Sequence, residues 1–215
     1  MDCNHILGHG HQELVCAQLA YDNLENMPRF VNKGISGQTM VQIAARWDED
    51  VLKYKPAVVS LLAGVNDISR CLDEDTGTFT AKYINAAEEA VSKTFNVLPD
   101  VKFFLCEPFY LDAKNQTDKY AFIPHPICEP DFTFGNANCT DETVKKYNEK
   151  LDAICAALKE TAEKHGAIFV PFRDLFADAT KKVHPSYLVW DNVHPTVVGH
   201  KLMADRWLEI AAKYM

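Results

Sequence analysis

The stretch "AVVSLLAGVNDI" (57–68) decides the fold class of this chain. Its first eight residues are mostly apolar and β-branched, and a Gly-Val-Asn-Asp segment (64–67) overlaps the end of this run. A short apolar run of this kind is typical of a strand buried on both faces of a parallel sheet. We therefore expect a strand at 57–64, with polar residues at its carboxyl end.

Strands and helices alternate on both sides of this segment. Further strands are expected at 29–34, 101–108 and 167–172. Helices are expected at 13–21, 39–47 and 81–98, from Thr140 or Asp141 to Gly166, and from about Thr196 to the end of the chain. This alternation predicts a three-layer α/β/α fold with a parallel sheet. We find no repeat, low-complexity stretch or linker, and expect a single domain over residues 1–215.

The composition argues against several classes of partner. The chain has 215 residues and a formal net charge of -8, so it has no basic face for nucleic acid or for an anionic membrane. No apolar run reaches the roughly 20 residues of a membrane helix, and the N-terminus lacks a signal-peptide pattern.

The seven cysteines also bear on the compartment. They form no C-x-x-C pair, which argues against a zinc or redox motif. Several lie in apolar patterns, as buried free thiols do in a reducing compartment, so we expect a cytoplasmic protein. Cys128 and Cys139 flank one loop and could pair if the protein were exported.

Three polar stretches follow predicted strands. They are "GISG" (34–37), "GVND" (64–67) and "DNVHP" (191–195). In open parallel sheets, ligands bind outside the carboxyl ends of the strands. We therefore expect a functional site that involves these three stretches.

Asp191 and His194 are candidates for an acid–base pair. An aspartate three residues before a histidine can accept a hydrogen bond from one ring nitrogen, which fixes the tautomer and stabilises the imidazolium. Pro195 suits the first position of the final helix. The alternative is a helix-capping aspartate beside a surface histidine.

Gly37 and Asn66 are candidates for oxyanion donors. Gly37 offers a backbone N–H at a strand-to-helix turn, and Asn66 offers a side-chain amide at the mouth of a strand. The alternatives are an ordinary glycine-rich turn for "GISGQT" (34–39) and an Asx turn or helix cap for Asn66 and Asp67.

These motifs carry a resemblance to a known superfamily. "GISG", "GVND" and "DNVHPTVVGH" (191–200), in this order, resemble the second, third and fifth blocks of the SGNH (GDSL-type) esterases and lipases, and "LGHGHQELVCAQL" (7–19) and "CEPFYL" (106–111) resemble connecting segments of its bacterial acylhydrolases. The resemblance implies a flavodoxin-like sheet and hydrolysis of acyl esters without a metal or organic cofactor. It implies that His194 is the base, that Asp191 orients it, and that Gly37 and Asn66 donate to the oxyanion.

The first block of that superfamily does not occur in the sequence. It consists of a strand followed by Gly-Asp-Ser and supplies the nucleophile, whereas this chain starts with "MDCNHILGHGH" (1–11), so the expected serine lies before Met1. Without that strand we expect an opened sheet with unpaired edges. Other candidate nucleophiles are Cys3 and the serines, which are Ser36, Ser60, Ser69, Ser92 and Ser186. The spacing of His5, His9 and His11 resembles no standard metal-ligand set.

Two hypotheses about function follow. The first is a carboxylic ester hydrolase for small acyl or acetyl esters, whose serine is not visible in this chain. The second is an inactive pseudohydrolase that binds an acyl or sugar ligand or pairs its open sheet with a partner chain. The long aperiodic segment 110–139 could line the substrate pocket, and an unpaired sheet edge favours a homodimer.

Overall fold

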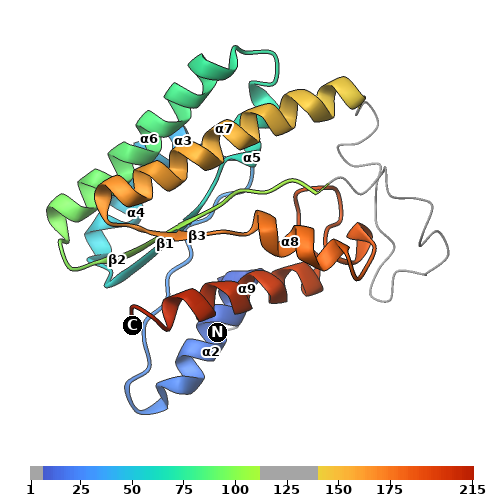
Figure 1. Cartoon of the computed structure of the whole chain (residues 1–215). Helices are drawn as coiled ribbons and strands as arrows, with labels where there is room; N and C mark the ends of the chain where they lie inside the picture. The colour runs from blue at the N-terminus through green and yellow to red at the C-terminus, as the bar shows by residue number, and fades with distance from the viewer. Residues whose placement is uncertain (1–6, 112–139) are drawn as a thin grey trace. The chain divides into compact units, whose positions relative to one another are not determined.

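The computed structural model describes residues 7–111 and 140–215 (Figure 1). They fall into two compact units, one with residues 7–34, 111 and 174–215, and the other with 35–110 and 140–173. Cys3, His5, the Cys128–Cys139 pair and nearly all of segment 110–139 lie outside the described residues, and the single domain stays a prediction. The helices and strands are α2 (His11–Asp22), η1 (Leu24–Asn26), α3 (Met40–Ala45), α4 (Trp47–Asp50), η2 (Leu52–Tyr54), β1 (Val58–Leu62), α5 (Val65–Arg70), α6 (Thr76–Val97), β2 (Lys102–Cys106), α7 (Asp141–His165), β3 (Ile168–Val170), α8 (Arg173–Thr180), η3 (Pro185–Tyr187) and α9 (Val197–Ala211).

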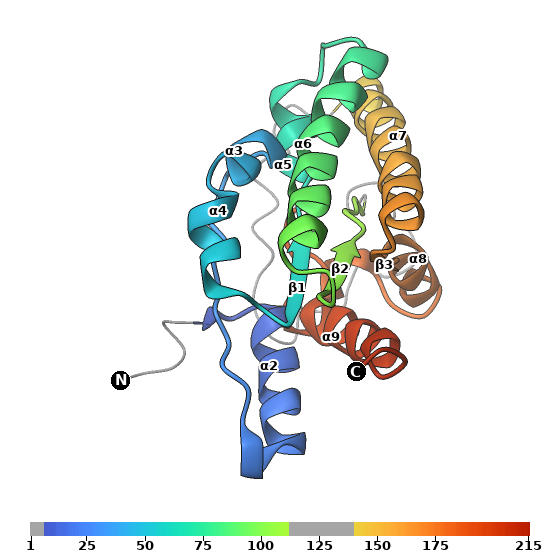
Figure 2. The same ribbon diagram turned by 90° about the vertical axis from the view of Figure 1, so that its left-hand side faces the viewer.

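The second unit is built on a parallel sheet with the order β1-β2-β3. Val59 pairs with Phe103, and Cys106 pairs with both Leu62 and Val170. The long helices α6 and α7 lie side by side along this sheet (Figure 2). Strand β2 is buried from Phe103 to Cys106, as a strand with a neighbour on each side is expected to be.

Strand β1 is confirmed, but its burial differs from the expectation. Val59 and Leu61 are buried, whereas Val58 and Ser60 are exposed, so the strand alternates instead of being buried on both faces. Among the described residues β1 pairs only with β2. The strand is therefore an edge strand within the described part of the chain, and the backbone groups on its outer side have no partner strand there.

The predicted strand at 29–34 is wrong. Residues 7–57 contain helices, turns and irregular segments but no strand. A strand needs a neighbour with which to share its backbone hydrogen bonds, and no strand in the described residues pairs with this segment.

The other predicted elements are confirmed, with small changes at their ends. Helix α7 begins after Thr140, whose side chain accepts from the Thr143 N–H, and it ends at Gly166 in the left-handed conformation. The helix expected at 39–47 is divided into α3 and α4, and the sequence reasoning missed the short helices α5, α8, η1, η2 and η3. None of the helices in the described parts of the chain combines the length and apolar character that crossing a membrane requires.

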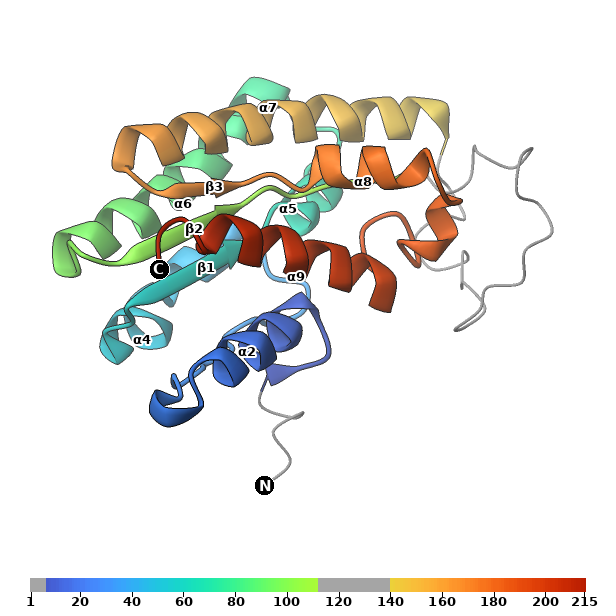
Figure 3. The same cartoon turned by 60° about the horizontal axis from the view of Figure 1, so that its bottom comes forward.

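In the first unit, α2 and α9 lie side by side (Figure 3). The His11 backbone N–H at the start of α2 donates to Nδ1 of His200 over 3.1 Å. The cap of α9 is Thr196, whose side chain accepts from the Gly199 N–H. Pro195 therefore precedes the cap and is not the first helical residue, because it forms an isolated antiparallel bridge with Val189.

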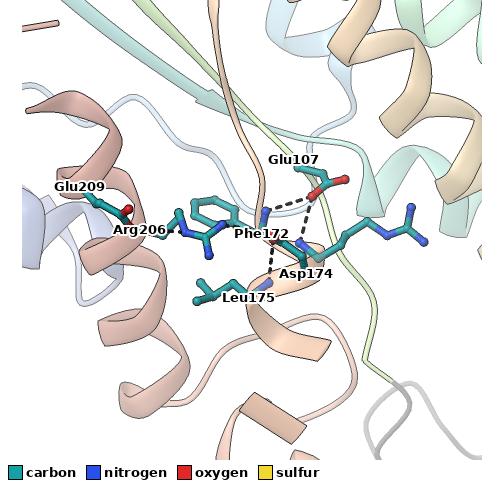
Figure 4. A network of polar contacts seen from close by, with 7 residues as sticks. Glu107, Phe172, Asp174, Leu175, Arg206 and Glu209 are labelled. Carbon is teal, nitrogen blue, oxygen red and sulfur yellow. Dashed lines mark hydrogen bonds and ion pairs between the residues drawn. The ribbon is translucent and has the colours of Figure 1, made fainter. Parts of the chain in front are cut away.

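Polar contacts fix the start of α8 (Figure 4). In the second unit, the Glu107 carboxylate accepts from the backbone N–H groups of Phe172 and Arg173 at 3.0 and 2.9 Å. In the first unit, Asp174 accepts from the Leu175 N–H and forms an ion pair with Arg206. These carboxylates satisfy N–H groups that a helix leaves unpaired in its first turn.

Candidate functional site

Asp191 and His194 form a direct hydrogen bond in the first unit. Nδ1 of His194 lies 2.7 Å from Oδ2 of Asp191. The other oxygen, Oδ1, accepts from the backbone N–H groups of His194 and Val193 at 2.9 and 3.2 Å. Asp191 thus orients the His194 ring with one carboxylate oxygen and closes an Asx turn in the loop with the other, whereas the cap of α9 is Thr196. Its acid–base role stays a prediction.

The contact shifts the pKa of both residues of the pair. Burial acts to raise the pKa of Asp191, but its hydrogen bonds with His194 and Val193 outweigh burial and lower that pKa. The hydrogen bond to Asp191 raises the pKa of His194 above its ordinary value. The Asp191 side chain is 13% exposed and the His194 side chain 70% exposed. Asp191 is therefore a half-buried anion that favours the protonated form of an accessible imidazole.

The loop that carries the pair is held by backbone hydrogen bonds. The Trp190 N–H donates to the His194 carbonyl over 2.8 Å, and the Leu111 N–H donates to the Asn192 carbonyl over 2.8 Å. Asn192 adopts a positive φ of 82°, which asparagine tolerates better than most residues. These bonds fix the direction in which the Asp191 and His194 side chains leave the loop.

Gly199 fastens this loop to α9. A Cβ at Gly199 would lie 2.2 Å from the Leu188 carbonyl oxygen and 2.9 Å from Cβ of Pro195. Only glycine allows the helix to approach the backbone so closely.

Gly37 lies in a tight turn of the second unit. The Gln38 N–H donates to the Ile35 carbonyl over 3.3 Å, and Gly37 has a φ of +78°. This is the conformation that the third residue of a type II turn requires, and glycine adopts it without strain. The Gly37 N–H has no hydrogen-bond acceptor within the described residues.

Three side chains of α5 contact the segment that starts with this turn. Nδ2 of Asn66 donates to the Gln38 carbonyl over 3.1 Å. Both carboxylate oxygens of Asp67 accept from the Met40 N–H, at 2.9 and 3.1 Å. The structure thus brings the "GISG" and "GVND" stretches together in one unit.

Arg70 completes this set of contacts. Its Nη2 donates to the Gly37 carbonyl over 2.6 Å, and its Nη1 donates to Oε1 of Gln42 over 3.2 Å. Gln42 in turn forms a reciprocal capping box with Thr39 at the start of α3. The turn and the first residues of α3 are therefore held by the same helix.

Asp67 is buried, at 6% exposure. Burial raises its pKa to about 6, against the opposing effect of the hydrogen bond from Met40 and of the charge of Arg70. The alternative that Asp67 is a helix cap is supported by its bond to Met40, although the capped helix is α3 and not its own.

The other candidate nucleophiles have structural contacts. The Ser60 hydroxyl lies 3.5 Å from the Cys106 thiol in the sheet. The Ser186 hydroxyl lies 2.8 Å from Nδ1 of His184, which also accepts from the Ser186 N–H and so caps η3. Ser36 is exposed within the Gly37 turn.

The histidines of the N-terminal segment have separate contacts. His9 lies 3.7 Å from Glu13 as an ion pair, and the His11 ring stacks on that of His200. In the parts of the chain that the structure describes, no group of three or more His, Cys, Asp or Glu residues is arranged to hold a metal ion.

The sequence reasoning missed the role of Arg70 and the long-range contact of Asp67. Asp67 ends the "GVND" stretch and Arg70 follows it by three residues, but their partners are 27 to 33 residues away. No local spacing pairs them with residues 37–42. The one available signal was the placement of "GISG" and "GVND" at the ends of predicted strands.

Comparison with known proteins finds a family and a relative that match most of the chain. Residues 7–202 match the model of the GDSL-like Lipase/Acylhydrolase family. The chain is 30% identical over 204 residues to the acetylxylan esterase of Geobacillus stearothermophilus. The matched region covers 94% of this chain and 80% of that protein.

Solved structures match as well. A crystal structure described as a GDSL-like lipase from Parabacteroides merdae has a TM-score of 0.76 and 29% identity, over 97% of this chain and 84% of that one. A crystal structure of the Geobacillus stearothermophilus acetylxylan esterase has a TM-score of 0.71 and 27% identity, over 94% and 80%. These matches, with the parallel sheet, confirm the three-layer α/β/α fold class expected from the sequence.

Proposed function

Since the chain belongs to the GDSL-like lipase/acylhydrolase family, we propose that it is a carboxylic ester hydrolase for small acyl or acetyl esters. The observation that carries the proposal is the 2.7 Å hydrogen bond between Asp191 and Nδ1 of His194. This bond leaves Nε2 of an exposed imidazole to accept and return a proton, which is the task of a general base in acyl transfer.

The proposed reaction has two steps. His194 takes the proton of a serine hydroxyl while the serine oxygen attacks the ester carbonyl, and Asp191 stabilises the imidazolium. The Gly37 N–H and one N–H of Asn66 donate to the oxyanion of the tetrahedral intermediate. The imidazolium then gives its proton to the leaving alcohol oxygen as the ester C–O bond breaks, which leaves an acyl-enzyme. In the second step His194 takes a proton from water as the water oxygen attacks the acyl carbonyl, and it returns this proton to the serine oxygen as the acid is released.

The class of substrate is also a proposal. A relative named acetylxylan esterase supports an acetyl ester, with an acetylated sugar as the first compound to try. With a net charge of -8 the chain favours small uncharged esters over anionic lipid surfaces. We place the protein in the cytoplasm, supported by the buried free thiols of Cys106 and Cys155.

The position of the nucleophile defines a second candidate function. Residues 1–215 contain no Gly-Asp-Ser motif. If no serine is supplied by a segment encoded upstream, the chain is a pseudohydrolase that binds an acyl or sugar ligand or a partner chain without cleaving it.

Hydrolysis of p-nitrophenyl acetate tests both candidates. We would compare residues 1–215 with a version extended by the in-frame codons upstream of Met1. We expect turnover in the extended protein alone. If both proteins are folded and neither has activity above the uncatalysed rate, the hydrolase proposal fails and binding of acetylated xylo-oligosaccharide becomes the measurement. If residues 1–215 alone hydrolyse the ester and His194→Ala abolishes it, the nucleophile lies within the chain.

A further inference from the structure

Three side chains of helix α5 bind backbone groups of the Gly37 turn and of the start of α3. Asn66 binds the Gln38 carbonyl, Asp67 binds the Met40 N–H, and Arg70 binds the Gly37 carbonyl. Asn66 has a proposed role at the oxyanion, whereas the proposed reaction gives no role to Asp67 and Arg70.

A glycine that serves as an oxyanion donor has to be held from outside. Glycine has the widest range of accessible backbone conformations, so its N–H does not point in one direction unless the neighbouring peptides are fixed. Donors to an oxyanion work because they are aligned before the charge develops. The Gly37 N–H belongs to the peptide between Ser36 and Gly37, which lies inside the turn closed by the bond from the Gln38 N–H to the Ile35 carbonyl. Its direction is therefore fixed when the peptide groups that follow Gly37 also have firm partners.

The contacts of α5 supply those partners. Arg70 fixes the carbonyl of the peptide directly after Gly37, and Asn66 fixes the carbonyl of the next peptide. Asp67 fixes the N–H of Met40, where α3 begins. The Gly37 N–H itself has no acceptor among the described residues, so the bonds restrict the turn without occupying this donor.

Arg70 suits this role better than a lysine would. Its planar guanidinium reaches two acceptors at once, the Gly37 carbonyl at 2.6 Å and Oε1 of Gln42 at 3.2 Å. A lysine ammonium keeps the charge but lacks the rigid fork that binds two acceptors in a fixed geometry. The distinction allows the charge of Arg70 to be separated from its geometry.

We propose that Arg70 and Asp67 are positioning residues that fix the Gly37 N–H in the orientation required to donate to the oxyanion. This inference rests on the proposed ester hydrolysis for its chemical meaning. The positioning itself is a property of residues 35–70 and is measurable without substrate.

The first experiment measures the turn by NMR on the chain of residues 1–215. We would compare backbone amide shifts of Arg70→Lys and Arg70→Ala with those of Ser69→Ala, a control on the same helix whose hydroxyl donates only within α5, to the Val65 carbonyl. We expect both Arg70 variants to move the Gly37 and Gln38 amides several-fold more than the control does, with unchanged signals in α7. Equal small shifts in all three variants would overturn the proposal.

The second experiment measures catalysis in the form of the protein that hydrolyses p-nitrophenyl acetate. We expect Arg70→Ala and Arg70→Lys each to lower kcat about 10- to 100-fold, with KM changed little. A normal kcat in Arg70→Lys would overturn the proposal, because charge alone would then suffice. If the wild-type protein has no activity in any form, the hydrolase proposal fails. The positioning proposal is then tested by the backbone amide shift of Met40 in Asp67→Asn, and an unchanged shift overturns it as well.

Discussion

The Asp191–His194 loop and the Gly37 turn are built in opposite ways. In the loop the two side chains are three residues apart and 2.7 Å from each other. In the turn the side chains of Asn66, Asp67 and Arg70 come from 27 to 33 residues away. The Asp191–His194 contact is therefore local to its loop, whereas the Gly37 turn depends on the contacts that α5 makes with residues 37–42. Disturbances of the tertiary fold should affect the turn first.

The largest expected effect concerns the loop. In the form of the protein that hydrolyses p-nitrophenyl acetate, we expect His194→Ala to lower kcat about 10³-fold or more, because the base that deprotonates the nucleophile is lost. His9→Ala is the control, since it removes another exposed histidine. Activity in His194→Ala within about threefold of wild type would break the assignment of the base.

The next effect concerns the buried carboxyl of the turn. Because burial raises the pKa of Asp67 from 3.8 to about 6, the folded protein keeps its proton up to a higher pH than the unfolded chain does. Stability should therefore fall as pH rises from about 4 to about 6. The difference of about two pKa units between the folded and the unfolded state corresponds to about 3 kcal/mol of unfolding free energy.

Urea unfolding between pH 4 and pH 7 measures this contribution. We expect Asp67→Asn to lose it, while Asp73→Asn, at a side chain that is 87% exposed, keeps the wild-type profile. Arg70, Lys82 and Tyr83 also interact with the Asp67 charge and stay in place in both variants. Parallel profiles for all three proteins would show that Asp67 does not hold a raised pKa.

A smaller effect tests how firmly the loop is held. Gly199→Ala places a Cβ against the Leu188 carbonyl oxygen, and we expect it to lower the unfolding free energy by about 1–3 kcal/mol. Val198→Ala, at an exposed position of the same helix, should change it by less than about 0.5 kcal/mol. If Gly199→Ala is as stable as Val198→Ala, the loop tolerates displacement and is less rigid than its contacts imply.

The smallest expected effect on stability concerns Asp191, which supports the proposed base His194 without replacing it. We expect Asp191→Asn to lower the pKa of His194, because the hydrogen bond to a carboxylate that raises it is lost. The change in unfolding free energy should stay below about 1 kcal/mol, since the His194 side chain is 70% exposed. NMR titration of the His194 ring checks the direction, and an unchanged midpoint would contradict the role of Asp191.

The same contrast explains what the sequence could and could not predict. Asp191 and His194 were predictable because spacing alone allows their contact. The fold class was predictable because β1 to β3 and the long helices α6 and α7 have clear apolar patterns. Asn66 was identified by its place after β1, and Gly37 by its place after the strand expected at 29–34, which the structure does not contain. The catalytic roles of both residues stay predictions.

Other features depended on contacts that no local pattern encodes. The strand expected at 29–34 has a suitable pattern, yet none of the described strands pairs with it. Val58 and Ser60 were expected to be buried and are exposed, because burial depends on what covers a strand and not on its own residues. Arg70 belongs to none of the sequence motifs, and its bond to the Gly37 carbonyl is visible only in the structure.

The compact organisation of the Asp191–His194 loop has a consequence for recombination. The pair and most of the backbone groups that orient it lie between Leu188 and Thr196, whereas the residues that shape the Gly37 turn lie between Ile35 and Arg70. A chimera with a crossover in α8 therefore inherits the Asp191–His194 pair from one parent and the Gly37 turn from the other, and the bond from the Leu111 N–H to the Asn192 carbonyl then joins the two parental segments. Libraries shuffled at that point would vary the strength of the base and the alignment of the donors as two independent traits.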